Sequence, residues 1–154
     1  MPHDTDPETG APLFDLLWEA TVDVAPREDF GAGPTGHRFM VPILGGEFRA
    51  GTVDAALSGV VLPGGADRQL VHPDGFKELD ALYEMQTACG AILTIRNRVK
   101  IDESVMPERY ARSVIDVKAP TGRFDWLNRR LIVGTMSSAR PQRQAVIIRA
   151  WGNG

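Results

Sequence analysis

The sequence predicts an all-β protein, most simply a closed antiparallel β-barrel of about eight strands. The chain has 154 residues, of which 43% are hydrophobic, so it can bury one sizeable core. Its 16 glycines and 11 prolines interrupt the chain often, which disfavours long helices. Between these interruptions lie about nine or ten segments in which apolar residues alternate with polar ones. A barrel is favoured over a sandwich because closure leaves no strand edge exposed.

The N-terminal part of the chain divides into a tail and a first strand. Residues 1–11 are polar and lack periodicity, so we expect a disordered tail, followed by a single barrel domain over residues 12–154. From Phe14 to Val24 apolar residues occupy every second position. This pattern is typical of a long strand with one buried face.

Shorter strands are expected along the rest of the chain. Residues 38–43 and 47–51 are interpreted as a hairpin around a turn at Gly45 and Gly46, because a Gly-Gly pair between two short strands favours a tight turn. The remaining predicted strands are residues 55–62, 69–71, 91–99, 113–117, 124–135 and 144–151.

Residues 76–89 are the ambiguous stretch. Phe76, Leu79 and Leu82 recur at intervals of three, which allows a helix. Ala81 and Tyr83, however, alternate with polar neighbours, and the segment is bounded by glycines. We interpret it as a strand.

Charge and composition exclude several classes of partner. The net charge is −3, so no overall basic field favours nucleic acid or an anionic membrane. The chain begins without a recognisable signal sequence and has no apolar run of membrane-spanning length, so a cytoplasmic location is expected. Residues 108–154 are basic, with scattered arginines. These arginines suggest either cross-strand pairing with the acidic part of the chain or an anionic ligand or partner.

Several short motifs carry a resemblance to a known family. The most specific is Leu62-Pro63-Gly64-Gly65-Ala66-Asp67, because several constrained positions occur in one order. The others are Gly36-His37-Arg38, Gly45-Gly46-Glu47-Phe48, Asp74-Gly75, Leu79-Asp80-Ala81-Leu82-Tyr83, Gly90-Ala91, Asn97-Arg98 and Asp125-Trp126-Leu127-Asn128. Across roughly residues 13–151 the chain resembles the bacterial and fungal family of domain of unknown function 3237.

The resemblance implies a fold and a kind of chemistry. The family looks like a compact antiparallel barrel, similar to allene oxide cyclase, dirigent or lipocalin-type barrels. A fungal member closes a ring without a cofactor by adding a phenolic oxygen to an alkene, which implies acid–base chemistry inside the barrel. This chain departs from the family pattern at Arg68, Leu82 and Cys89, where Trp, Arg and Asp are usual. These departures put a shared substrate in doubt.

Four residues are candidates for catalysis. Asp67 and Arg38 lie in the family-like motifs, and a carboxylate held by a guanidinium often fixes a polar pocket. Asp67 or Asp80 is expected to act as general base, with a pKa raised by burial, and Arg38 or Tyr83 to stabilise the developing oxyanion. The alternative is structural: Asp67 caps a glycine turn and Arg38 makes an ion pair.

Substrate-binding candidates come from the same predicted strands. Trp126 is a candidate for stacking on an aromatic ligand, with Asn128 orienting that ligand, although an aromatic residue in a barrel strand often only fills the core. The further polar candidates are Gln69, Glu84 and Arg96. Parity alone does not say which face of each strand looks inward.

The expected function is therefore binding of a hydrophobic or aromatic small molecule, with cofactor-independent cyclisation, isomerisation or elimination. Neither a metal nor a cofactor is expected, because His37 and His72 stand apart from other metal-ligating residues and no phosphate-binding glycine motif is present. Two alternatives remain open. One is a carrier or sensor barrel without chemistry, and the other is an oligomeric structural protein. A homo-oligomer is expected for the protein.

Overall fold

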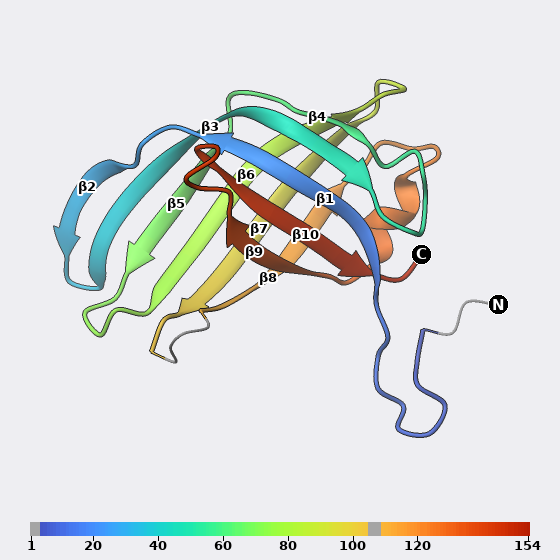
Figure 1. The fold of residues 1–154 in the computed structure, drawn as a ribbon, viewed down its shortest axis with the longest axis horizontal. Helices are drawn as coiled ribbons and strands as arrows, with labels where there is room; N and C mark the ends of the chain where they lie inside the picture. The colour runs from blue at the N-terminus through green and yellow to red at the C-terminus, as the bar shows by residue number, and fades with distance from the viewer. Residues whose placement is uncertain (1–3, 105–108) are drawn as a thin grey trace.

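A computed structural model describes residues 4–104 and 109–154, and in this part of the chain the strands form one antiparallel sheet closed into an eight-strand barrel (Figure 1). The predicted fold class is confirmed. The elements are β1 (Asp15–Val24), β2 (Glu28–Gly33), β3 (Gly36–Ala50), β4 (Gly59–Val61), β5 (Ala66–Val71), β6 (Lys77–Thr87), β7 (Ile92–Asp102), β8 (Tyr110–Lys118), the short 3-10 helix η1 (Asp125–Arg129), β9 (Ile132–Ser138) and β10 (Ala145–Gly152).

The long strand β3 explains why ten strands occupy eight positions. The C-terminal half of β3 lies between β1 and β4, whereas its N-terminal half lies between β2 and β5. β1 and β2 therefore share one position, and β4 and β5 share another. β1 also pairs with β10, which closes the barrel.

The hairpin predicted around Gly45 and Gly46 is wrong, because β3 runs through both residues without reversing. Gly46 has a φ of +132°, and a Cβ there would lie 2.0 Å from the carbonyl oxygen of Thr21 on β1. The two glycines therefore allow β3 to bend and to approach β1 closely. A Gly-Gly pair serves both a turn and a strand bend, so the sequence could not separate them.

Two further predicted strands are shortened. Residues 124–135 contain η1 before β9, and residues 55–62 contribute only β4 at Gly59–Val61. Phe124 and Leu127, spaced by three, are both buried, which is the spacing of one face of a 3-10 turn. In contrast, the ambiguous stretch is confirmed as strand β6, whose residues alternate between buried and more exposed along its length.

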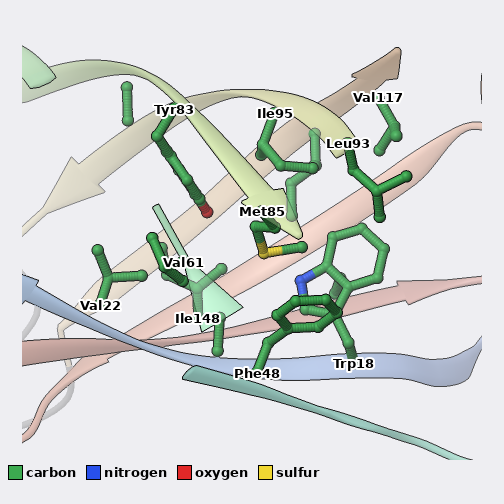
Figure 2. Packing of buried hydrophobic residues seen from close by; sticks show 14 of the residues in the cluster. Trp18, Val22, Phe48, Val61, Tyr83, Met85, Leu93, Ile95, Val117 and Ile148 are labelled. Atoms are coloured by element: carbon green, nitrogen blue, oxygen red, sulfur yellow. The ribbon is translucent and has the colours of Figure 1, made fainter. Parts of the chain in front are cut away.

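The interior near η1 is tightly filled. Leu57 is fully buried there. Trp18, Phe48 and Met85 are almost wholly buried in the same core cluster (Figure 2). The loop between β3 and β4 closes this end, held to the η1 side by Arg123, whose Nη2 donates to Asp54 Oδ1 at 2.8 Å. Leu57, which belongs to this loop, is fully buried in the core, so the loop covers this end of the barrel.

The segment before β1 extends away from the barrel wall in Figure 1. The tail predicted for residues 1–11 begins with residues 1–3, which lie outside the described part of the chain. Beyond them, the N–H of Leu13 donates to the carbonyl oxygen of Asp4 at 2.9 Å, which closes a turn. Among the residues that the structure describes, no helix is long and apolar enough to cross a membrane.

Candidate functional site

The half of the barrel away from η1 encloses a cavity of about 820 Å³. Most of its wall is apolar, including Val22, Val41, Leu79, Val99 and Ile148. The volume lies within the range of about 300–1,000 Å³ that is usual for small-molecule sites. The interior is therefore large enough for a ligand of several rings.

Asp67 on β5 is the carboxylate that faces this cavity. Gln69, two residues further on the same face, donates from Nε2 to Asp67 Oδ2 at 2.9 Å. Asp67 Oδ1 is buried and has no hydrogen-bond partner among the described residues. Burial raises the pKa of Asp67 to about 6, an effect that the Gln69 hydrogen bond opposes and the charge of Asp80 reinforces.

The small side chain of Ala81 leaves a notch beside Asp67. Strand register places Asp67 opposite Ala81 on β6, and Ala81 opposite Asn97 on β7. Since adjacent strands are about 4.8 Å apart, Asp67 and Asn97 flank the small Ala81 side chain at a separation of roughly 10 Å. Asn97 is 1% exposed, and within the described chain its Oδ1 also has no partner. Asp67 and Asn97, which both line the cavity, thus each carry an unpartnered acceptor oxygen, and a ligand O–H or N–H donor over Ala81 would satisfy one of them.

Tyr83 completes the polar part of the site. It lies two residues beyond Ala81 on the same face of β6 and is 1% exposed. Its hydroxyl points away from β6 into the barrel interior (Figure 2). Burial, and then the negative charge of Asp67, raise the pKa of Tyr83 above its ordinary value. The phenol therefore keeps its proton and can donate a hydrogen bond.

Arg38 does not lie opposite Asp67 in the sheet, so the predicted ion pair between them is wrong. On β3, Val41 pairs with Asp67, whereas Arg38 pairs with Leu70 and is exposed. Arg38 and Val41 are three residues apart, so their side chains point to opposite faces of the strand. Arg38 thus lies on the outer surface and cannot stabilise an oxyanion inside the barrel.

Asp80, Arg96 and Glu84 also lie on the outer face. Asp80 accepts two hydrogen bonds from Arg96, at 3.1 Å from Nε and 2.9 Å from Nη2. This pairing holds the pKa of Asp80 below its ordinary value. Glu84 shares the outward parity of Asp80 on β6 and does not line the cavity. The expectation that Asp80 serves as a base within the barrel is therefore wrong.

Trp126 and Asn128 lie in η1 at the closed end and do not line the cavity. Asn128 Oδ1 accepts the N–H of Ala119 at 2.8 Å, and Asn128 Nδ2 donates to the carbonyl oxygen of Ala119 at 3.0 Å. Trp126 packs, partly buried, against the hydrophobic core. Both residues support the closed end of the barrel, because the predicted strand that carried them is a 3-10 helix.

The departures from the family pattern also lie outside the cavity. Arg68 and Leu82 have the outward parity of their strands, and Cys89 is exposed in the turn after β6. Asn97 is the residue that sequence reasoning left without a role. The signal was present, since Asn97 shares an apolar strand face with Ile95 and Val99, and an uncharged polar residue on such a face marks a buried polar group.

Comparison with known proteins identifies relatives along almost the whole chain. A family model described as protein of unknown function (DUF3237) matches residues 12–152. A UPF0311 protein of Bradyrhizobium diazoefficiens is 32% identical over 151 residues, covering 88% of this chain and 95% of that protein. A UPF0311 protein of Rhodopseudomonas palustris is 33% identical over 126 residues, covering 73% of this chain and 78% of that protein.

Solved structures show the same barrel. A protein with unknown function from Clostridium acetobutylicum superposes with a TM-score of 0.80 at 25% identity, covering 92% of this chain and 99% of that one. A beta-barrel like protein from Acinetobacter baumannii gives 0.79 at 25% identity, covering 94% and 99%. An enzyme from Penicillium herquei gives 0.68 at 17% identity, covering 99% and 96%, a likeness of fold alone.

Proposed function

The chain belongs to the DUF3237 family, and from that premise we propose that its cavity binds a hydroxyaromatic small molecule on which Asp67 acts as general base. The observation that carries the proposal is the unpartnered Oδ1 of Asp67 inside a cavity of about 820 Å³. A buried acceptor without a partner is costly, and a ligand hydroxyl over Ala81 would remove that cost.

The protonation state of Asp67 supports the role of a base. A general base works best when its pKa lies near the pH at which the protein acts. Burial brings the pKa of Asp67 to about 6, so the carboxylate is mostly ionised at neutral pH and more basic than an exposed aspartate. Tyr83 remains protonated and could donate to the oxyanion that forms.

The proposed step is an isomerisation that forms a ring. Asp67 takes the proton of the ligand's phenolic or enolic hydroxyl, and the O–H electron pair stays on oxygen. That oxygen forms a C–O bond with an alkene carbon of the same molecule, and the other alkene carbon takes the proton back from Asp67. Cyclisation of this kind consumes no co-reactant, and elimination is its reverse.

Ligand binding is tested by calorimetry with naphthol and with methoxynaphthalene, which has no hydroxyl donor. We expect naphthol to bind about tenfold more tightly than methoxynaphthalene to the unmodified protein. Asp67→Asn should lose most of this preference, whereas Asp80→Asn, a matched change on the outer face, should keep it. Equal binding of the two ligands, or an unchanged preference in Asp67→Asn, would contradict the proposal.

Base chemistry is tested separately with nitrobenzisoxazole, whose ring opens when a base removes its C–H proton. We expect the protein to accelerate this opening, with a rate that rises as the pH passes about 6 and Asp67 ionises. Asp67→Asn should abolish the acceleration and Asp80→Asn should retain it. Acceleration that survives in Asp67→Asn would remove Asp67 from the role of base.

The alternative of a non-catalytic carrier or sensor uses the same cavity. It predicts naphthol binding without acceleration of the ring opening, so the two measurements together separate it from the enzyme. A purely structural role as an oligomer predicts a filled interior, and the cavity of about 820 Å³ argues against that role as the whole function. Homo-oligomer formation itself stays a prediction.

A further inference from the structure

The open end of the cavity is lined by positive charge from four separate segments. Arg27 comes from the connection between β1 and β2, Lys77 from the start of β6, Arg109 from just before β8, and Arg140 from the connection between β9 and β10. Among the described lining residues, Asp67 is the sole carboxylate. The cavity therefore has a cationic rim, defined as these four residues, and an acidic group deep in its wall.

Two of the rim cations have partners that fix their position. The Arg27 guanidinium carbon lies 3.9 Å from the centre of the Phe39 ring, which holds it by a cation–π contact. Lys77 Nζ donates to Glu103 Oε1 at 2.8 Å. Glu103 offsets the charge of Lys77, and the three arginines leave the rim with an excess of positive charge. Such an excess at the mouth of an apolar cavity attracts and orients an anionic ligand.

The cationic rim and the notch over Ala81 are placed to contact the two ends of one ligand. Lys77 and Ala81 lie on the same face of β6, four residues apart. At about 3.3 Å per residue this places them roughly 13 Å apart along the strand. A rigid ligand of about two aromatic rings spans that distance, and the wall between the ends is apolar, with Leu79 between them.

We propose that the ligand class is a hydroxyaryl carboxylate, with its hydroxyl over Ala81 between Asp67 and Asn97 and its carboxylate among Arg27, Lys77 and Arg140. This inference rests on the proposed function and adds a second, charged anchor to it. The rim cations, of which Arg109 and Arg140 belong to residues 108–154, then explain part of the positive charge of the C-terminal third of the chain. They select for an acid and set its direction, so that the hydroxyl enters first.

The test compares para-hydroxybiphenyl carboxylate with its neutral primary amide by calorimetry at about pH 8, where Asp67 is ionised. The two ligands share shape and hydroxyl and differ in the charge at one end. In the unmodified protein we expect the carboxylate to bind at least about tenfold more tightly than the amide. The preference should weaken as salt concentration rises.

The variant for the rim is Arg27→Gln together with Arg140→Gln. Its matched control is Arg129→Gln with Arg130→Gln, two exposed arginines at the closed end, which lowers the net charge by the same amount. We expect the rim variant to reduce the preference for the carboxylate to within about threefold, and the control to keep it. Binding of the amide should be the same in both variants.

The remaining outcomes of these binding measurements separate failure of the cationic anchor from failure of the proposed function. Equal affinity for carboxylate and amide in the unmodified protein overturns the cationic anchor and leaves the hydroxyaromatic function intact. A preference that survives in the rim variant also overturns the anchor. Failure of both ligands and of naphthol to bind overturns the proposed function itself, and the anchor with it.

Discussion

The two halves of the barrel use the same strands but side chains of different size. β1 contributes Trp18 to the packed half near η1 and Val24 to the cavity, while β6 contributes Met85 to the packed half and Ala81 to the cavity. The backbone spacing is that of one continuous sheet, so residue volume creates the hollow. We infer that the packed half stabilises the fold, so that the other half is free to hold a ligand.

A matched pair of leucines tests this division most strongly. Leu57 is fully buried in the packed half, whereas Leu79 lines the cavity. We expect Leu57→Ala to lower the free energy of unfolding by about 3–5 kcal/mol and Leu79→Ala by about 2 kcal/mol, because Leu79 already lacks packing partners on its cavity side. Urea denaturation of both variants measures the difference. Equal losses would mean that the two halves are packed alike.

Asp67→Asn should have the next largest effect, and it should stabilise the protein. The folded-state pKa of Asp67 is raised from 3.8 to about 6, so stability present below about pH 4 is lost as the pH rises through 6. The shift of about 2 pKa units corresponds to about 3 kcal/mol near neutral pH. We expect Asp67→Asn to exceed the unmodified protein by about that amount at about pH 8 and to match it near pH 4. Denaturation at several pH values measures this difference, and a constant difference would contradict it.

Filling the notch should affect binding more than stability. Ala81→Val places two additional carbons between Asp67 and Asn97, where the ligand hydroxyl is proposed to lie. We expect naphthol affinity to fall about tenfold, while the free energy of unfolding changes by less than about 1 kcal/mol because the cavity accepts the added volume. Calorimetry and denaturation of one preparation give both values. Unchanged affinity would place the hydroxyl elsewhere.

The smallest effect is expected for the outer carboxylate. Asp80 and Arg96 are both about half exposed, with side-chain exposures of 43% and 51%. We expect Asp80→Asn to cost at most about 1 kcal/mol near neutral pH. Because Arg96 lowers the pKa of Asp80, this contribution is lost as the pH falls. The sign is opposite to that of Asp67, and a gain in stability for Asp80→Asn would contradict the assignment of the two faces.

Closure of strand edges and the family resemblance predicted the barrel. Alternation along the chain predicted strands such as β1, β7 and β8. It was not sufficient to orient the site. On β6 both faces mix polar and apolar residues, and only the closed barrel makes Ala81 and Tyr83 inward and Asp80 outward. The pairing of Asp67 with Val41 rather than Arg38 depends on register between strands, which single-sequence patterns do not contain.

Asp67, Gln69 and Tyr83 were named from the sequence, and the structure brings them to one cavity. Trp126 and Asn128 were misplaced because alternation with Leu127 over a few residues also fits a short 3-10 turn. The cationic rim was not predicted, since its members lie in four segments that meet only when the barrel closes.

The proposed function depends on Asp67 being a buried base with an acceptor oxygen that a ligand hydroxyl can satisfy. The pKa of Asp67, measured by ¹³C NMR of its carboxyl carbon, tests this directly. We expect a titration midpoint of about 6 in the ligand-free protein, and a lower midpoint when saturating naphthol donates a hydrogen bond to the carboxylate. A midpoint near 3.8, the ordinary value, would contradict the claim, and so would a midpoint that naphthol leaves unchanged.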